Sequence, residues 1–221
     1  MNIGIIGSGE MGSCLASKLT KLGHTVSVAN SRGPALEELV KDKEVVMVSI
    51  PQKNIPLLPK ALFKDLPVVI DTGNYYPNLR DGNIPALDQG GVDSLWVQEQ
   101  LGIPVVKVFN SILATSLKDK SKPKGEKDRI ALAVSGDDAK AKEIVFKLVD
   151  DLGFDPFDLG TIAQSWKQQP GAVIYCRDLN LEELKRRVDT MPDLQSVITK
   201  RKADEVLMKA DYPAYLKSLQ H

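Results

Sequence analysis

The chain has 221 residues with 29 basic and 29 acidic side chains, so its formal net charge is zero. Hydrophobic residues make up 43% and charged residues 26%, which is the balance of a globular chain with a sizeable core and excludes a disordered one. The even charge argues against nucleic acid as a partner, because binding to phosphates needs a basic excess. No apolar run approaches the ~20 residues of a membrane span, and the first residues lack a secretory signal. We therefore expect a cytoplasmic protein that does not bind membranes.

Cysteine and histidine are too scarce for several kinds of site. Cys14 and Cys176 have no second cysteine near them, so no zinc knuckle or redox pair of cysteines is expected. Cys14 falls in an apolar helical stretch and is expected to be a small buried side chain. His24 and His221 are the only histidines, which argues against a metal site or a histidine-based catalytic triad.

Short apolar runs alternate with amphipathic stretches through the first 160 residues. This order predicts an α/β fold of the Rossmann type, a doubly wound and mainly parallel sheet flanked by helices. Runs with apolar residues at nearly every position suit strands that are buried on both faces. The predicted strands are Asn2–Ile6, Thr25–Ala29, Val45–Ile50, Val68–Asp71, Val105–Phe109 and Ile130–Val134, with a seventh over Phe154–Leu159.

Two helices of this domain are clear from their apolar spacing. Met11–Leu22 carries leucines on one face and ends at Gly23, a residue suited to the C-terminal end of a helix. Asp137–Leu152 has a continuous apolar stripe, and Ser135-Gly136-Asp137 is the expected N-terminal cap.

The rest of the chain divides into loops and a small helical part. Asp119–Arg129 has no apolar residue and is expected to be an exposed surface loop, with a basic rim near an anionic cofactor as the less favoured alternative. Trp166–Gly171 is interpreted as a polar turn, and helices are predicted over Leu181–Val188 and about Asp193–Met208. We predict a nucleotide-binding domain over residues 1–160 and a helical cap or oligomerisation segment over 161–221, which is short for an independent domain.

The glycine motif Gly7-Ser8-Gly9-Glu10-Met11-Gly12 directly follows the first strand and opens the first helix. In this context a Gly-x-Gly-x-x-Gly pattern indicates a dinucleotide site. The first glycine permits the tight turn, the second lets the backbone approach a pyrophosphate, and the third lets helix and strand pack closely. The free N–H groups at the start of the helix would bind the anion.

The end of the second strand decides which dinucleotide is expected. NAD sites carry a carboxylate there for the ribose 2′-hydroxyl, but this chain has Asn30, Ser31 and Arg32. A hydroxyl and a guanidinium suit a 2′-phosphate instead. The prediction is NADP(H) in preference to NAD(H).

Other strand ends supply further candidates on the same edge of the sheet, where ligands of such folds bind. Ser49, Ile50 and Pro51 follow the third strand, and Asn110 follows the fifth; we expect these to contact the cofactor. Asp71 ends the fourth strand and is interpreted as part of a turn, because Asp favours turns.

The residues resemble those of the F420-dependent NADP oxidoreductase family. The resemblance is carried by the glycine motif and a series of later segments: Asn30–Arg32, Val48–Pro51, Val105–Ser111, Val134–Asp138 and Phe157–Gly160. It implies a sheet of six to eight strands with a small C-terminal helical part, frequently dimeric. It also implies hydride transfer between NADPH and a deazaflavin (F420-like) or flavin-type acceptor. The tail, from Gln168–Cys176 onward, differs from that of F420-using members of the family.

The sequence is compatible with such a hydride transfer because the cofactors carry the chemistry and the protein positions them. The scarcity of histidine and the absence of an evident catalytic lysine count against a hydroxy-acid or alcohol dehydrogenase, which needs a general base. Alternatives are an NADP(H)-binding sensor without turnover and a reductase of ferric chelates or of a small imine or carbonyl. An imine reductase would need a proton donor, for which Tyr76 and Tyr175 are the candidates. We expect a homodimer with Tyr212–Tyr215 near the acceptor, and no metal.

Overall fold

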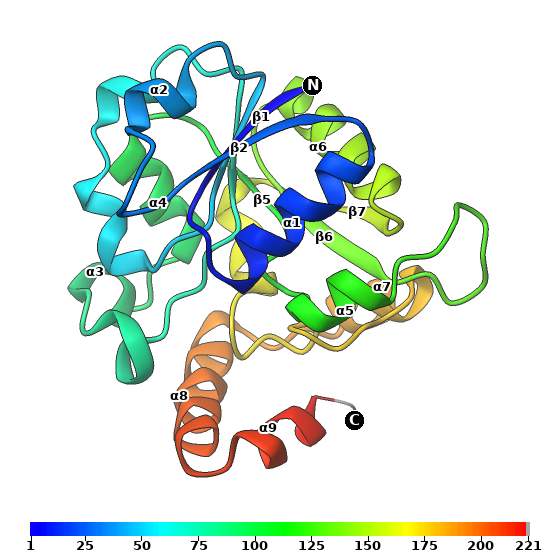
Figure 1. Cartoon of the computed structure of the whole chain (residues 1–221). Helices are drawn as coiled ribbons and strands as arrows, with labels where there is room; N and C mark the ends of the chain where they lie inside the picture. Colours follow the sequence, from blue (N-terminus) through cyan, green and yellow to red (C-terminus); the bar gives the residue numbers. More distant parts are fainter. Residues whose placement is uncertain (220–221) are drawn as a thin grey trace.

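The computed structural model describes residues 1–219, so the last two residues of the predicted cap, including His221, lie outside the described residues. Its centre is a seven-stranded sheet in the order β2-β1-β3-β4-β5-β6-β7, parallel except for the antiparallel pair β5–β6 (Figure 1). This confirms the predicted doubly wound sheet. The strands are β1 Asn2–Ile6, β2 Thr25–Ala29, β3 Val45–Val48, β4 Val68–Asp71, β5 Val106–Lys107, β6 Ala131–Ser135 and β7 Asp155–Gly160.

Helices cover both faces of the sheet (Figure 1). One face packs against α1 (Glu10–Lys21), α5 (Ala114–Asp119) and α6 (Ala139–Asp151). The other packs against α2 (Leu36–Val40), α3 (Pro85–Asp88) and α4 (Asp93–Leu101). The apolar runs of the strands are buried because they contribute side chains to both of these cores.

Two predicted strands are shorter in the structure. The third ends at Val48, before the Ser49-Ile50-Pro51 segment, where Pro51 lacks the N–H that a ladder needs. The fifth contains only Val106 and Lys107. The residues that follow each strand therefore lie in loops at the carboxyl edge of the sheet.

The cap of α6 differs from the prediction by one residue. The side chain of Asp138 accepts hydrogen bonds from the backbone N–H groups of Lys140 and Ala141, so Asp138 caps the helix. Asp137 instead accepts a hydrogen bond from the N–H of Ile162, at 3.1 Å. This contact joins two segments that are far apart in the chain, and therefore a local motif could not reveal it.

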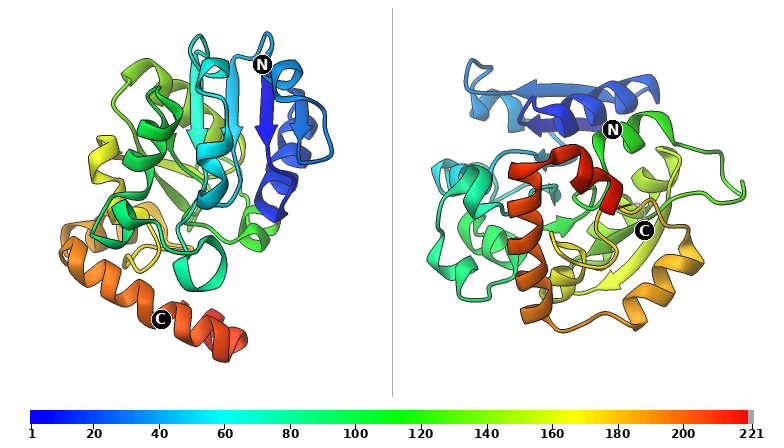
Figure 2. Two further views of the ribbon diagram at one scale, coloured as in Figure 1. Left: turned by 90° about the vertical axis from the view of Figure 1, so that its left-hand side faces the viewer. Right: turned by 90° about the horizontal axis from the view of Figure 1, so that it is seen from below.

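The C-terminal part begins after β7 with a short 3-10 helix, η4 (Ile162–Gln168). The helices α7 (Leu181–Asp189), α8 (Leu194–Ala210) and α9 (Tyr212–Ser218) follow. In Figure 2, α8 and α9 lie beyond the carboxyl ends of the parallel strands. The segment Trp166–Gly171 was predicted as a polar turn, but its first three residues belong to η4, and Gln168 and Gln169 are buried.

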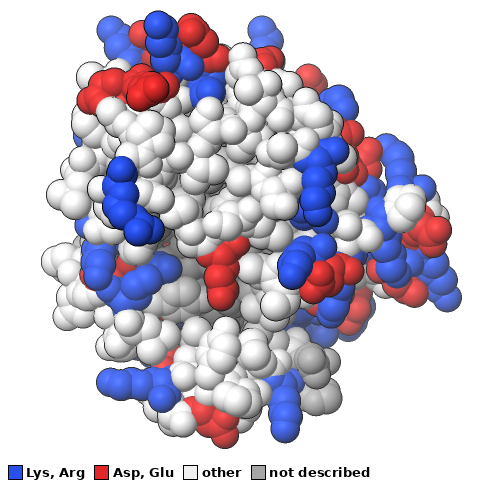
Figure 3. All heavy atoms as spheres, viewed as in Figure 1, with Lys and Arg blue, Asp and Glu red and all other residues white. Residues whose placement is uncertain are grey.

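The loop that joins α5 to β6 projects from the body (green, right side of Figure 1) and carries side chains of both charge signs (Figure 3). It is exposed as predicted, except for Arg129 at its end, which is buried. Within residues 1–219, no helix combines the length and the apolar character that a membrane crossing requires.

Candidate functional site

The three glycines of the motif have the geometry of a pyrophosphate turn. Gly7 has φ +114°, and a Cβ there would lie 2.1 Å from the carbonyl oxygen of Ser49. A Cβ on Gly12 would lie 2.2 Å from the carbonyl oxygen of Gly7, so only glycine lets α1 pack this close to the turn. A Cβ on Gly9 would meet nothing within 4 Å. The backbone at Gly9 therefore faces open space at the start of α1, where an anion is favoured.

The end of β2 lies beside this turn. Asn30 donates from Nδ2 to Oγ of Ser8 at 3.0 Å, and its Oδ1 accepts from the backbone N–H of Arg32 at 2.9 Å. These contacts hold the Asn30–Arg32 segment next to the glycine motif. The guanidinium of Arg32 is exposed and makes no hydrogen bond or ion pair with other residues in the range 1–219.

A cavity of about 540 Å³ runs from the glycine turn across the carboxyl edge of the sheet. Its size lies within the range of small-molecule and cofactor sites. The structure brings together eleven of the predicted cofactor residues on its wall: Gly7, Ser8, Gly9, Glu10, Met11, Asn30, Ser31, Ser49, Ile50, Pro51 and Asn110. Gly12 does not line the cavity because it serves the packing of α1, and Arg32 lies outside the wall on the exposed turn.

The far end of the cavity is built from an amide network that was not predicted as a whole. Asn110 donates from Nδ2 to Oδ1 of Asn74 at 3.0 Å and to the carbonyl oxygen of Gln168 at 2.7 Å. Gln168 in turn donates to Oδ1 of Asn110 at 2.9 Å. Both N–H groups of the Asn110 amide are thus already paired within the protein. Asn110 fixes the shape of the wall, and only its oxygen retains capacity for a ligand.

Two tyrosines meet behind the same wall. The hydroxyls of Tyr76 and Tyr175 share a short hydrogen bond, and Tyr175 and Cys176 line the cavity. Burial raises the pKa values of the Tyr76 and Tyr175 hydroxyls well above the ordinary value for tyrosine. It also raises the pKa of the Cys176 thiol to about 12. All three groups are therefore protonated near neutral pH. Cys176 also has φ +53°, a strained conformation that often marks functional sites.

A buried ion pair sits beneath the rim of the cavity. Lys107 Nζ lies 2.9 Å from Oδ2 of Asp71, and both side chains are completely inaccessible to solvent. Asp71 also accepts hydrogen bonds from Ser94 Oγ at 2.8 Å and from the backbone N–H of Gly73 at 2.7 Å. Its contact with Gly73 is the turn predicted for Asp71, whereas the partnership with Lys107 was not predicted. Lys107 does not line the cavity, so it is not a candidate base.

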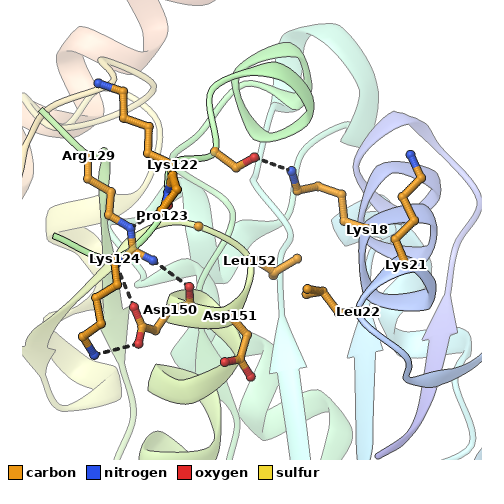
Figure 4. A pocket seen from close by; sticks show the side chains of 12 residues that line it. Lys18, Lys21, Leu22, Lys122, Pro123, Lys124, Arg129, Asp150, Asp151 and Leu152 are labelled. Atoms are coloured by element: carbon orange, nitrogen blue, oxygen red, sulfur yellow. Dashed lines mark hydrogen bonds and ion pairs between the residues drawn. The ribbon is translucent and has the colours of Figure 1, made fainter. Parts of the chain in front are cut away.

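A second hollow, of about 410 Å³, lies at the opposite end of α1 (Figure 4). Lys18 and Lys21 from the last turn of α1 face the 119–129 loop there. Arg129 is paired with Asp150 at 2.7 Å and with Asp155 at 2.6 Å, so its charge is neutralised within the protein. The basic loop therefore does not form a rim at the glycine turn. Among residues 1–219, no group of three or more His, Cys, Asp or Glu side chains is arranged to hold a metal ion.

Comparison with known proteins agrees with this site. Residues 2–36, which hold β1, the glycine motif and the end of β2, match the family model "NADP oxidoreductase coenzyme F420-dependent". A 56-residue segment is 48% identical to the protein YjhV of Escherichia coli (strain K12); the match covers 25% of this chain and 41% of YjhV. The chain therefore spans less than half the length of this curated relative.

Solved structures extend the likeness to most of the fold. The hypothetical protein SMa0349 from Sinorhizobium meliloti is 28% identical, with a TM-score of 0.59, over 75% of this chain and 87% of that one. A candidate F420-dependent NADP reductase from Arthrobacter sp. FB24 is 23% identical, with a TM-score of 0.62, over 75% of this chain and 87% of that one. This likeness shows that the two chains share a fold.

The class that the fold and the glycine turn define is that of the Rossmann-type dinucleotide-binding proteins. Within that class the resemblance to the F420-dependent NADP oxidoreductase family is confirmed, through residues 2–36 and the shared fold.

Proposed function

We propose that this protein is an NADP(H)-dependent oxidoreductase that transfers a hydride between NADPH and a deazaflavin (F420-like) or flavin-type acceptor. The observation that carries the proposal is the cavity of about 540 Å³ at the carboxyl edge of the sheet, which has two unlike ends. One end is the glycine turn with its open space beside Gly9, and the other is the wall of Asn74, Asn110 and Tyr175. Two small molecules bound end to end would bring their reactive rings together.

The residues at the glycine turn fit a dinucleotide. The N–H groups at the start of α1 are free to bind a pyrophosphate, and the hydrogen bond from Asn30 to Ser8 keeps the adjacent segment in place. Ser31 and the unpaired guanidinium of Arg32 supply the groups that a 2′-phosphate requires. When bound, the nicotinamide would supply the hydride chemistry.

The rest of the chain positions the reactants and excludes water. Ile50 and Pro51 offer an apolar edge to the middle of the cavity, and the paired amides of Asn74 and Asn110 keep the far wall rigid. Such rigidity is what effective alignment of two rings demands, because a hydride transfer depends steeply on distance and orientation. No ionised acid or base on this wall is required for the transfer itself.

The direct test is an acceptor panel with purified protein. We expect NADPH to bind more tightly than NADH, and NADPH oxidation to be supported by F420, FMN or FAD. Absorbance at the NADPH band and direct binding titration measure the two properties separately. Micromolar binding of NADPH with no oxidation by any flavin-type acceptor or ferric chelate would instead identify an NADP(H)-binding sensor.

A second candidate function, reduction of a small imine or carbonyl, is favoured by the Tyr76–Tyr175 pair. A neutral tyrosine hydroxyl at the acceptor wall is a suitable proton donor to a developing amine or alkoxide, and its partner tyrosine orients it. This candidate predicts turnover with small cyclic imines or ketones and none with flavins.

We also propose that the protein forms a homodimer through its C-terminal helices. Tyr215 is buried in the same apolar cluster as Tyr175 and Cys176, so α9 supports the acceptor wall from within the same chain. Tyr212 and Val206 remain 50% and 69% exposed, and a second subunit would cover them. Sedimentation equilibrium of the wild type and of Val206→Glu tests this arrangement; a wild-type monomer would contradict it.

A further inference from the structure

We propose that Arg80 recognises an oxyanion, a phosphate or carboxylate, on the acceptor molecule, and that it therefore determines which ring compounds the enzyme accepts. The inference rests on the proposed function and names a residue that carries no motif in the sequence. Arg80 lies in η3 (Pro77–Asp81), a single wide helical turn after β4, and its side chain lines the cavity.

Arg80 is placed at the acceptor end of the cavity. Its guanidinium lies over the ring of Tyr76, 5.5 Å from the ring centroid, and Nη2 donates to the backbone carbonyl of Asn74. Tyr76 contacts Tyr175, and Asn74 contacts Asn110, so both neighbours of Arg80 belong to the far wall. The pyrophosphate turn has its own N–H donors at the start of α1, and it does not depend on Arg80.

The guanidinium is held in one orientation by a buried carboxylate. Asp81, whose side chain is fully inaccessible, accepts from Nε of Arg80 at 3.2 Å and from Nη2 at 3.0 Å. The same carboxylate accepts from the backbone N–H of Tyr76 at 2.8 Å, so it is itself fixed. A guanidinium that is already oriented loses little entropy when a ligand arrives.

One edge of the guanidinium remains available. Nη1 makes no hydrogen bond with the residues that the structure describes, and 39% of the Arg80 side chain is exposed. Two N–H groups on one nitrogen, beside an open cavity, suit an oxyanion oxygen.

The local charge also favours an anion. Asp81 offsets one positive charge, but Lys53 donates from Nζ to the carbonyl oxygen of Arg80 at 2.8 Å and adds a second cation. Arg80, Lys53 and Asp81 together leave an excess of one positive charge. Glu205 accepts a hydrogen bond from Nδ2 of Asn78 in the same turn at 2.7 Å, and its negative charge is offset by the nearby Arg201. A neutral ring would gain nothing from this arrangement, whereas a ring with a charged tail would.

The test compares two acceptors that differ only in a phosphate, FMN and riboflavin. For the wild type we expect the KM for FMN to be about tenfold to a hundredfold lower than that for riboflavin, which is the range for a charge-assisted hydrogen bond. Arg80→Gln should bring the two KM values within about twofold of each other. Arg80→Lys keeps the positive charge beside Asp81 but lacks the planar set of N–H donors of a guanidinium. The ratio of the KM for riboflavin to that for FMN should therefore lie between those of the wild type and Arg80→Gln.

A binding measurement makes the test independent of turnover. Quenching of flavin fluorescence by the NADP⁺-loaded protein gives a Kd for FMN and for riboflavin, and the same ratio is expected. Arg186→Gln is the matched control, because Arg186 is 69% exposed on α7 and should leave both ratios unchanged. Thermal melting of each variant excludes a folding defect.

The outcomes separate this inference from the proposed function. Equal KM and Kd values for FMN and riboflavin in the wild type, or an FMN preference that survives Arg80→Gln, would overturn the role of Arg80 even if both flavins oxidise NADPH. If F420, FMN and riboflavin all fail to oxidise NADPH but FMN binds in preference through Arg80, the proposed reaction fails while the anion site stands. If neither FMN nor riboflavin binds, the role of Arg80 is overturned, and the proposed reaction then depends on the assay with F420.

Discussion

The guanidinium of Arg201 in α8 lies over the ring of Tyr75, 4.9 Å from the ring centroid, and both side chains are buried. Nη1 of Arg201 is 4.0 Å from Oδ1 of Asp93 at the start of α4. No nitrogen of the guanidinium has a hydrogen-bond partner within residues 1–219. A buried charge thus ties α8 to the loop after β4 and to α4, through a ring face and a single carboxylate.

This arrangement makes stability depend on pH through Asp93. Burial raises the pKa of Asp93 from 3.8 to about 6, although Lys107 and Arg201 act to lower it. Between these two values the folded state binds a proton that the unfolded state has lost, so the free energy of unfolding falls as pH rises from about 4 to 6. The full loss is on the order of 3 kcal/mol above pH 6.

We therefore expect the difference in unfolding free energy, Asp93→Asn minus wild type, to increase across that interval and then to level off. Urea unfolding at several pH values measures it. Asp193→Asn gives the opposite sign, because hydrogen bonds at the α8 N-terminus lower the pKa of the Asp193 carboxyl and its contribution is lost as pH falls below 4. A pH-independent difference for Asp93→Asn would show that the carboxyl is not desolvated.

Alanine at two glycines of the motif should separate nucleotide binding from folding. Gly9→Ala meets no neighbouring atom within 4 Å, so we expect an unchanged melting temperature and a Kd for NADPH raised about tenfold or more, because the methyl group fills the space beside α1. Gly12→Ala collides with the Gly7 carbonyl at 2.2 Å and should lower both stability and affinity. Isothermal titration of NADPH and thermal melting of the two glycine variants measure these effects. Tight NADPH binding by Gly9→Ala would show that the pyrophosphate does not bind at this turn.

Arg32 should control the choice of nucleotide. Removal of its charge in Arg32→Gln is expected to weaken NADPH binding by about tenfold to a hundredfold and to leave NADH binding within about twofold. The wild-type preference should also shrink at high salt, because the side chain is exposed. Equal affinity of the wild type for both nucleotides, or an unaltered preference in the variant, would refute the assignment of NADP(H).

The tyrosine pair distinguishes the two candidate reactions. With a flavin-type acceptor, Tyr175→Phe should keep kcat within about threefold, because the ring nitrogens of the acceptor exchange protons with solvent. With an imine or carbonyl substrate, the same variant should lose about 10²-fold or more in kcat, the usual contribution of a positioned acid. Tyr76→Phe is the companion variant, and steady-state kinetics on both acceptor classes gives the answer.

Replacing one member of the buried ion pair Lys107–Asp71 should lower the free energy of unfolding far more than replacing both members with apolar residues. Lys107→Met leaves Asp71 charged and inaccessible, which costs about 3–5 kcal/mol. Adding Asp71→Leu should restore part of that loss, because an apolar pair needs no compensating charge. Denaturant unfolding of the single and double variants measures the coupling; additive effects would argue against a true ion pair.

The glycine-turn half of the cavity could be predicted from the sequence because its determinants are local. β1 and β2 have the predicted bounds, and the glycine turn joins consecutive residues whose spacing alone implies its shape. The runs of β-branched residues buried on both faces leave little ambiguity between strand and helix.

The acceptor half could not be predicted in the same way because its contacts join distant segments. Asn110 pairs with Asn74, 36 positions away, and with Gln168, 58 positions away. Gln168 and Gln169 have the composition of a polar turn, yet both are buried. The amide of Gln168 donates to backbone carbonyls of β5 and β6, and the amide oxygen of Gln169 accepts from the N–H of Asp93 at 3.3 Å. The sequence pattern did not predict α4. Polar Ser94 is buried in this helix together with Trp96 and Val97, so the helix lacks the regular apolar spacing by which an amphipathic helix is recognised.

The hydrogen bonds of Gln168 have a consequence for how this protein could diverge. Its side-chain amide donates to the backbone carbonyls of Lys107 and Ala133 and to Oδ1 of Asn110, so one residue after β7 joins β5, β6 and the cavity wall. The residues proposed to choose the nucleotide lie before residue 52, whereas Tyr175 and Cys176 come from the segment after Gly160. Exchange of that later segment between related chains, with Gln168 retained, is expected to reshape one side of the far wall while the glycine turn and Arg80 stay in place.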